Sequence, residues 1–333
     1  MGLGRLTIRR NQLHWKVVVF SLLVVVLIVP IARCQAQSGR GAVPQATGRA
    51  PLMLLPDRGS LPARENRPQG DAWAPPDIDV AVPSVTHSDA CSLPDVVSQA
   101  DKRVQELVNN LDRFTATEFV EHQTVGWAGK LAKAQGRKFD YLVSIGPSRS
   151  GYLSMQEYRS RAGNSAQFPD QIVTEGTPSL ALVFHPRYAP DFDMKCEGLG
   201  VWQGQPAWQV RFEGLPDRAS HLSGVVVKNK RYTVRLRGRA WILANSYQMA
   251  RLETDLADTI PAIRLRLQHL SVEYRPVAFP GRQTTLWLPA SAELYLDFWG
   301  HRFYRKHRFT DFTLFSVDVN QVIARATDAS LPR

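Results

Sequence analysis

The sequence predicts an α+β fold in which one leading amphipathic helix packs on a single, mostly antiparallel sheet of about ten strands. Apolar and polar residues alternate with a period of two in many short runs, as in strands with one buried and one hydrated face. Gly, Pro, Asn and Asp separate these runs at the spacing typical of all-β domains. Helical spacing is sustained over one long stretch, residues 92–111.

Residues 1–36 are predicted to be an export signal. Basic residues within 5–16 precede an uninterrupted apolar run that starts at Val17, which is the order of regions in such signals. The run is shorter than the roughly 20 residues that comfortably span a bilayer, and it is followed by an approximate cleavage site. We therefore expect cleavage after Ala36 in preference to retention as an N-terminal transmembrane anchor. Either way, the body of the chain is expected on the periplasmic or extracellular face of the cell membrane.

Residues 37–91 are predicted to form a flexible tether, because they are rich in Pro, Gly, Ala and Arg and have no sustained apolar period. Short apolar runs within this stretch, such as 80–85, would alternatively dock as edge strands. Removal of the signal leaves Cys91 and Cys196 as an even pair in an oxidising compartment. A disulfide between them and two separate buried thiols are both open at this point.

Residues 92–333 are predicted to form one domain. Ser92 and Pro94 are typical of a helix start, and apolar residues follow at helical spacing, so this helix must bury its stripe on the sheet. A short, continuously apolar run between Thr177 and Tyr188 is expected to contain a short helix that begins near Ser179. The strand-like runs outside the central segment 231–277 are 114–127, 139–145, 152–158, 201–202, 207–212, 225–227, 284–288, 293–298 and 301–317.

The segment 231–277 reads as four consecutive strands. Gly238 is expected to separate the first strand from the second, and turn residues near Asn245 are expected to close a hairpin. In the fourth strand the apolar positions are odd before residue 268 and even after residue 269, so a bulge near Gln268 or His269 would restore the alternation. Because bulges bend strands, we expect a strongly curved sheet.

The run GRAWILANSYQMARLETDL, from Gly238 to Leu256, and a long strand ending in Val272-Glu273-Tyr274 carry a resemblance. This region resembles the periplasmic lipoprotein-carrier and lipoprotein-sorting family and its sigma-factor-regulator relatives, and the match covers about a third of the chain at pattern level. The resemblance implies an unclosed, strongly curved antiparallel barrel with helices across its concave side and a cavity for acyl chains. None of that family's functional residues is carried over to this sequence.

Apolar residues on the expected inner face are the candidates for a ligand cavity. Such residues more often form a plain core, but a curved sheet covered by one helix leaves a concavity, and apolar concavities are the usual ligand sites. The candidate cavity residues are Trp208, Phe212, Leu236, Leu252, Leu265, Leu267, Leu294, Leu296 and Phe298.

The formal net charge of +11 would suggest a nucleic-acid partner in a cytoplasmic protein, but the export signal argues against that partner. Basic residues interleave with aromatic ones in two strands, which favours either a solvated outer face or a surface for anionic lipid headgroups or envelope polymers. The residues of this predicted basic surface are Arg235, Arg237, Arg302, Arg305 and Arg308.

The sequence contains no catalytic signature, and we predict no catalytic residue, no metal and no cofactor. His301 and His307 would lie about 20 Å apart on a continuous strand, too far to share a metal ion. For an enzyme acting on envelope polymers, the carboxylates to consider first are Glu157, Asp193 and Glu253.

These observations lead to one principal functional hypothesis and two alternatives. The principal one is an exported cell-envelope binding protein that holds a lipid or a lipidated partner in an apolar concavity. The first alternative is an envelope scaffold or sensor that binds another protein and has no ligand cavity, and the second is an envelope-polymer hydrolase. The sequence favours a non-enzymatic role and leaves the oligomeric state open.

Overall fold

The computed structural model divides the chain into two compact units, Met1–Ser60 and Leu61–Arg333, and every residue that the structure describes belongs to the second. The predicted export signal, residues 1–36, therefore lies outside the described residues. Within the described part of the chain, no helix has the length and apolar character needed to cross a membrane. The described residues are 72–86, 91–111, 113–147, 152–160, 172–218, 222, 224–227, 230–279 and 284–315.

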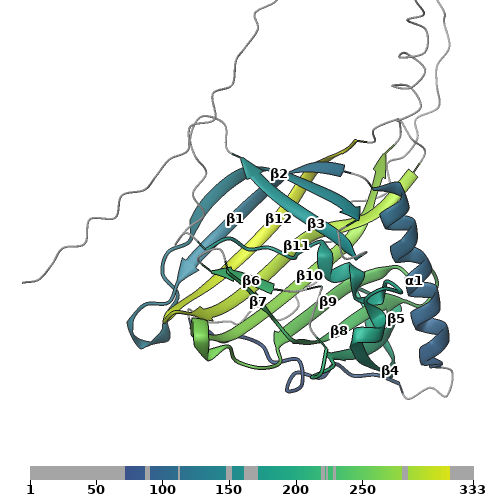
Figure 1. Cartoon of the computed structure of the whole chain (residues 1–333), viewed down its shortest axis with the longest axis horizontal. Helices are drawn as coiled ribbons and strands as arrows, with labels where there is room; N and C mark the ends of the chain where they lie inside the picture. The colour runs from purple at the N-terminus through teal and green to yellow at the C-terminus, as the bar shows by residue number, and fades with distance from the viewer. Residues whose placement is uncertain are drawn as a thin grey trace, which may run out of the picture. The chain divides into compact units, whose positions relative to one another are not determined.

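Ten strands of the second unit form one antiparallel sheet (Figure 1). They are β1 (Arg113–Thr124), β2 (Gln135–Pro147), β3 (Leu153–Ser160), β4 (Phe192–Trp202), β5 (Gln205–Gly214), β8 (Leu236–Leu243), β9 (Met249–Leu256), β10 (Leu265–Phe279), β11 (Thr284–Phe298) and β12 (His301–Phe315). Their order is β3-β2-β1-β12-β11-β10-β9-β8-β5-β4. No described residues pair the edge strands β3 and β4 with each other, so the curved sheet is an unclosed barrel, which confirms the predicted fold class.

The predicted leading helix is also confirmed as α1 (Leu93–Asn110), with a proline in its first turn. Its buried residues, Val96, Ala100 and Val104, are spaced by four and therefore lie on one side of the helix. This side packs against a short 3-10 helix, η3 (Ser179–Phe184), and against β4. Burial of this stripe against the sheet is what holds the helix in place.

The main core lies between the inner face of the sheet, α1 and η3. All residues of η3 from Leu180 to Phe184 are buried, which explains the continuous apolar run in the sequence and confirms a short helix that begins at Ser179. Phe184 contacts Phe212 of β5 edge-to-face, with ring centroids 6.5 Å apart. A separate hairpin of β6 (Gly224–Val227) and β7 (Lys230–Thr233) also packs against this core (Figure 1).

Gly238 lies inside β8, so the predicted strand break at this position was wrong. Phe212 of the neighbouring strand packs directly on the glycine: a Cβ there would lie 2.2 Å from Phe212 Cζ and 2.6 Å from Glu253 O. The glycine is therefore required by the close approach of an aromatic ring and not by a turn. The actual break lies between β7 and β8.

The predicted bulge near Gln268 or His269 lies slightly earlier in the strand. The register of β10 against β11 shifts between Leu265 and Leu267, which makes Arg266 the inserted residue, and pairing is regular at 268 and 269. The change of alternation required one extra residue, but the sequence pattern did not fix its position. An exposed arginine is suited to this role, because its side chain extends into solvent and needs no partner in the ladder.

Residues 72–86, which fall in the predicted tether, lie instead against the outer face of the sheet. Ile78 is 1% exposed, and its N–H donates to Asp255 Oδ2 of β9 at 2.9 Å. Thr86 forms an antiparallel bridge with Leu199 of β4. Composition alone did not reveal this contact, because it depends on acidic residues that meet arginines distant in the sequence.

Cys91 and Cys196 form a disulfide with a Cα–Cα distance of 6.3 Å, so the structure selects the paired alternative of the two open ones. The bond joins the residues just before α1 to β4 across a sequence separation of 105. It thereby fixes the start of the helix to the edge of the sheet.

Candidate functional site

A cavity of about 750 Å³ opens on the inner side of the sheet. Its floor is formed by β8 and β10, one wall by β3, and its roof by residues 175–188, which include η3. The hairpin of β6 and β7 closes a further side. A volume of this size falls in the range of roughly 300–1,000 Å³ typical of sites for small ligands.

The cavity lining is amphipathic. The apolar part comes from the floor, the roof and β3, and the polar part comes mainly from β3, the roof and the hairpin. The apolar residues are Leu153, Met155, Leu180, Leu182, Leu222, Leu236 and Leu270. The charged and amide residues are Gln156, Glu157, Glu175, Arg231 and Gln268. This combination can enclose a molecule that has both an apolar and a polar part.

The roof is attached to β3 by hydrogen bonds that involve the wall itself. The backbone N–H of Gly176 donates to Glu157 Oε1 at 2.5 Å. At the other end of the roof, the Tyr188 hydroxyl donates to the backbone oxygen of Leu153 at 2.5 Å. Because both acceptors belong to the edge strand, the roof and the wall of the cavity are held together as one structure.

Behind the wall lies a buried charge cluster, here called the inner cluster, made of Glu118, Tyr141, Glu157, Arg159 and His307. Arg159 donates to both oxygens of Glu118 at 2.5 and 3.1 Å and to Glu157 Oε2 at 3.2 Å. His307 Nδ1 lies 2.8 Å from Glu118 Oε1, and the Tyr141 hydroxyl donates to Glu157 Oε2 at 2.8 Å. These side chains come from four neighbouring strands and occupy positions of the inner face.

Burial and pairing shift the titration of the cluster in opposite directions. Burial raises the pKa of Glu157. Burial also acts to raise the pKa of Glu118, but the hydrogen bond from His307 and the charge of Arg159 outweigh it and leave that pKa lowered. Burial lowers the pKa of His307, which favours the neutral imidazole. The arginine charge is thus matched chiefly by Glu118.

Glu157 is engaged through both carboxylate oxygens, which bears on its chemical role. Oε1 accepts from Gly176, and Oε2 accepts from Tyr141 and Arg159. A carboxylate in this position fixes the roof more readily than it accepts a proton from a substrate. The other two carboxylates considered for a hydrolase are not near it: Asp193 is exposed on β4, and Glu253 of β9 pairs with Arg251.

The structure distributes the predicted cavity residues over four environments. Leu236 lines the cavity. Trp208 and Phe298 lie partly buried at the margin of the core. Leu267 is half-buried and, because the bulge precedes it, shares its side of β10 with His269. The predicted residues that lie within the main core are Phe212, Leu252, Leu265, Leu294 and Leu296.

Most of the cavity lining was not named from the sequence. Once the bulge is placed at Arg266, Gln268 and Leu270 fall on the same side of β10 as Leu265, and both line the cavity. The parity of residues along each strand is a sequence signal for the members of the inner cluster. Glu118, for example, occupies a position of β1 whose neighbours of the same parity, Ala116 and Val120, are apolar and buried.

The predicted basic surface is divided by the structure. Arg305 is fully buried and does not belong to a surface: it donates to His122 Nδ1 at 3.0 Å and to the backbone oxygen of Ile172 at 2.5 Å. Arg302 lies over the Trp73 ring, and Arg308 lies over the Phe119 ring. The two remaining positions, 235 and 237, belong to a network on the outer face.

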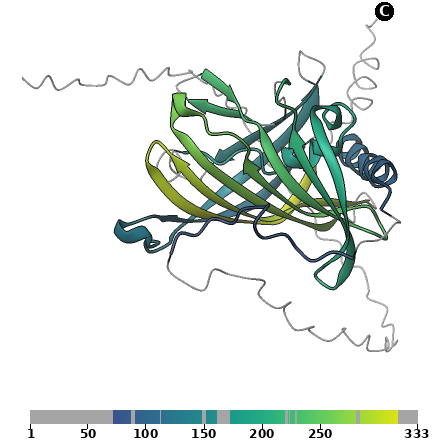
Figure 2. The same ribbon diagram turned by 90° about the horizontal axis from the view of Figure 1, so that it is seen from below.

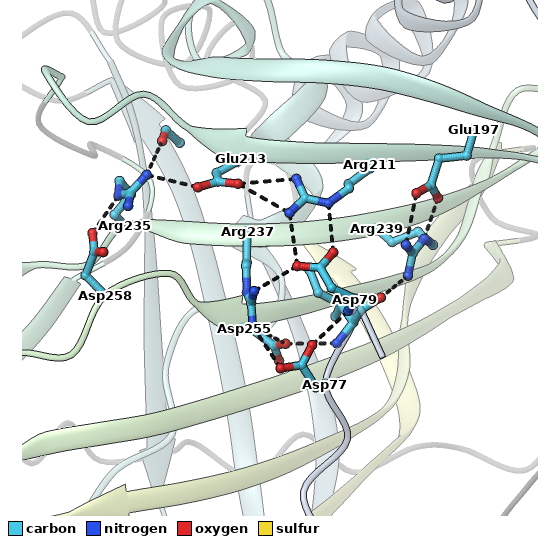
Figure 3. A network of polar contacts seen from close by, with 12 residues as sticks. Asp77, Asp79, Glu197, Arg211, Glu213, Arg235, Arg237, Arg239, Asp255 and Asp258 are labelled. Atoms are coloured by element: carbon cyan, nitrogen blue, oxygen red, sulfur yellow. Dashed lines mark hydrogen bonds and ion pairs between the residues drawn. The ribbon is translucent and has the colours of Figure 1, made fainter. Parts of the chain in front are cut away.

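This outer network is made of Asp77, Asp79, Arg211, Arg235, Arg237 and Arg239 together with the acidic residues next to them (Figure 3). Arg211 donates two hydrogen bonds to the Asp79 carboxylate, at 2.9 and 3.1 Å. Arg237 donates to Asp79 at 2.8 Å and to Asp77 at 2.9 Å. Arg239 is 1% exposed and donates to the backbone oxygen at position 78. The acidic residues that complete the network are Glu197, Glu213, Asp255 and Asp258.

The outer arginines are thus largely occupied by the chain's own residues 77–79. This arrangement attaches the N-terminal part of the described chain to the sheet and occupies Arg237 of the predicted basic surface, whereas Arg302 and Arg308 remain exposed. Among the described residues, no group of three or more His, Cys, Asp or Glu side chains is placed to hold a metal ion.

No protein-family model and no curated protein sequence match this chain. Among solved structures, it is similar to a DUF1329 family protein from Desulfovibrio piger, with a TM-score of 0.37 and 11% identity over 66% of this chain and 92% of that one. It is also similar to a structure described as an outer membrane lipoprotein-sorting protein domain from Vibrio parahaemolyticus, with a TM-score of 0.34 and 8% identity over 69% of this chain and 98% of that one. No ligand or activity of either protein is transferred to this chain.

Proposed function

We propose that this chain is an exported cell-envelope binding protein that holds a lipid, or the acyl chains of a lipidated partner, in the cavity between β3, η3 and the β6–β7 hairpin. The cavity is the observation that carries the proposal. Its leucine and methionine lining suits an acyl chain, and its charged and amide residues suit a headgroup. Each methylene that moves from water into such a site contributes about 0.8 kcal/mol, so the methylenes of one acyl chain together supply ample binding energy.

The export signal that the sequence predicts for residues 1–36 supports the proposed location. A protein on the periplasmic or extracellular face meets lipids and lipidated proteins of the envelope, and an apolar ligand cannot cross that aqueous compartment unaided. The unclosed sheet supports the proposed binding as well. On its open side the cavity is bounded by an edge strand and a roof and not by a continuous wall of strands, so a ligand can enter there.

The direct test is native mass spectrometry and solvent extraction of the full chain, purified from the cells that export it. We expect a co-purifying amphiphile in the wild type. Met155→Trp, which places an indole in the cavity, should reduce the bound fraction severalfold. Val201→Trp is the matched control, because it adds the same ring at an exposed position of β4 away from the cavity. Equal ligand content in the three proteins, or none in the wild type, would contradict the proposal.

A hydrolase acting on envelope polymers is the second candidate, and one observation favours it: the cavity wall contains a carboxyl group, Glu157, whose pKa burial raises. It ranks lower because both oxygens of that group already accept hydrogen bonds. Turnover of envelope polymers by the wild type, abolished in Glu157→Gln while the ligand content stays unchanged, would favour the hydrolase instead.

A further inference from the structure

Three connections lie at one end of the sheet and form a continuous rim (Figure 2). They are residues 125–134 between β1 and β2, residues 257–264 between β9 and β10, and residues 299–302 at the turn from β11 into β12. Backbone hydrogen bonds link the turn at 299–302 to each of the other two connections. The N–H at position 125 donates to the backbone oxygen at 302 at 2.9 Å, and the N–H at 299 donates to the backbone oxygen at 264 at 3.1 Å.

Trp127 projects from this rim with 96% of its surface exposed. The loop that carries it is nevertheless well bonded: Gly126 N–H donates to Lys130 O at 2.7 Å, and the turn is closed by Ala128 and Gly129, both with positive φ. An indole this exposed forgoes a large favourable burial energy. Because backbone hydrogen bonds hold the loop in this conformation, the exposure of Trp127 follows from the geometry of the turn.

A second tryptophan occupies the adjacent turn. Trp299 has a φ of 55° and is 44% exposed, and the guanidinium of Arg264 lies over its ring at 5.2 Å. The two exposed indoles come from opposite halves of the domain sequence but lie on neighbouring turns. They therefore form one shared surface, which is more informative than a single exposed tryptophan.

The same rim is strongly basic. Its one carboxylate, Asp258, is already paired with Arg235 at 2.7 Å. The cations within the three connections are Lys130, Lys133, Arg264 and Arg302, of which Arg302 pairs with Asp297 of β11 at 3.4 Å. Positive side chains of this kind are attracted to a negatively charged bilayer surface, and tryptophan rings prefer the depth of the lipid headgroups.

We propose that this rim docks on the surface of a bilayer that contains anionic lipid, with Trp127 at the level of the headgroups. The inference does not depend on what the cavity holds, but the two features are adjacent. Leu236 of the cavity floor pairs with Leu256, the last residue of β9, and the rim connection 257–264 begins directly after it. A protein docked in this way would present the floor end of its cavity toward the membrane.

The test uses the full chain and vesicles of phosphatidylcholine with brominated acyl chains, prepared with and without phosphatidylglycerol. Bromine quenches only tryptophans that reach the bilayer, so the fluorescence of each protein is compared between brominated and unbrominated vesicles. We expect quenching in the wild type that Trp127→Phe reduces, with Trp299 supplying the remainder. Trp202→Phe is the matched control, because this ring is 7% exposed in the outer-face core and cannot reach the bilayer.

Charge is tested in parallel by the double reversal Lys130→Glu/Lys133→Glu. With phosphatidylglycerol present, it should weaken binding by at least about fivefold for each lysine, because each reversal removes an attracted cation and adds a repelled carboxylate. Lys102→Glu/Lys195→Glu makes the same change in net charge at exposed positions of α1 and β4, and it should weaken binding far less. Two results would overturn the proposal: quenching of Trp127→Phe equal to that of the wild type, or equal loss of binding in the two double variants.

Discussion

The inner cluster and the outer network use the same chemistry on opposite faces of one sheet, yet they differ in solvation. The side chains of Arg159 and Glu118 are 5% and 0% exposed. In the outer network, Arg211 and Asp79 are 26% and 36% exposed. Water screens the outer pairs and competes for their donors, whereas burial shields the inner pairs from water.

The difference separates what each set of charges does for the molecule. The inner cluster fixes the wall and roof of the cavity, so disturbing it should alter both the stability of the domain and the site. The outer network attaches residues 77–79 to the sheet, so disturbing it should release a local segment and leave the core intact. Variants of matched chemistry on the two faces therefore measure how much burial contributes to the strength of an arginine–carboxylate pair.

The largest effect is expected from Arg159→Met. This substitution leaves Glu118 and Glu157 buried without their shared cation, and loss of one partner of a buried pair costs about 3–5 kcal/mol. The free energy of unfolding from denaturant titration should fall by that amount. The double variant Glu118→Met/Arg159→Met removes both charges and should recover a substantial part of the loss. A loss for Arg159→Met below that of an outer-network variant would contradict the comparison.

An intermediate effect is expected from pH through His307. Burial lowers the pKa of His307 in the folded state below its ordinary value of 6.5, so the unfolded chain binds its proton first as the pH falls. Stability should therefore decrease from about pH 6.5 downward, with a slope of about 1.4 kcal/mol per pH unit, until the folded-state pKa is reached. Glu118, whose pKa is lowered, adds a loss in the same direction at still lower pH.

Glu157 acts in the opposite direction, because its raised pKa means that the folded state binds its proton more readily. The measurement is therefore the difference in unfolding free energy between the wild type and His307→Asn across this pH range. The difference should shrink as the pH falls. A constant difference would show that His307 does not titrate between the two states.

The sequence was sufficient for the fold class, because alternation, turn residues and one helical stretch are local patterns that survive in the structure. The same holds for η3, whose continuous apolar run predicted a buried short helix. Local patterns did not place Arg266 as the inserted residue of β10, since any residue in that interval would restore the alternation. That one position decides whether Leu267 or Gln268 faces the cavity.

The site itself was less accessible to sequence reasoning. Glu118 and His307 meet across 189 positions of sequence, and no local spacing connects them. Their parity within β1 and β12 was nevertheless a usable signal, because a charged residue at a buried position requires a partner elsewhere in the fold. The docking of residues 77–79 had no comparable signal: a Pro-rich stretch with two aspartates resembles a linker until the arginines of the sheet are placed beside it.

The smallest effect is expected on the outer face, from Asp79→Asn. It weakens the contacts to Arg211 and Arg237, and partly exposed pairs contribute roughly 0–1 kcal/mol each, so global stability should change by about 1 kcal/mol. The sharper readout is hydrogen exchange at residues 72–86, which should increase in Asp79→Asn and, for the wild type, with salt. Asp258→Asn is the matched control, because it removes a similar carboxylate–arginine contact, the one to Arg235. Asp258 does not contact residues 72–86, so hydrogen exchange in that segment should stay unchanged. Equal exchange in both variants would show that apolar burial of Ile78, and not the ion pairs, holds the segment on the sheet.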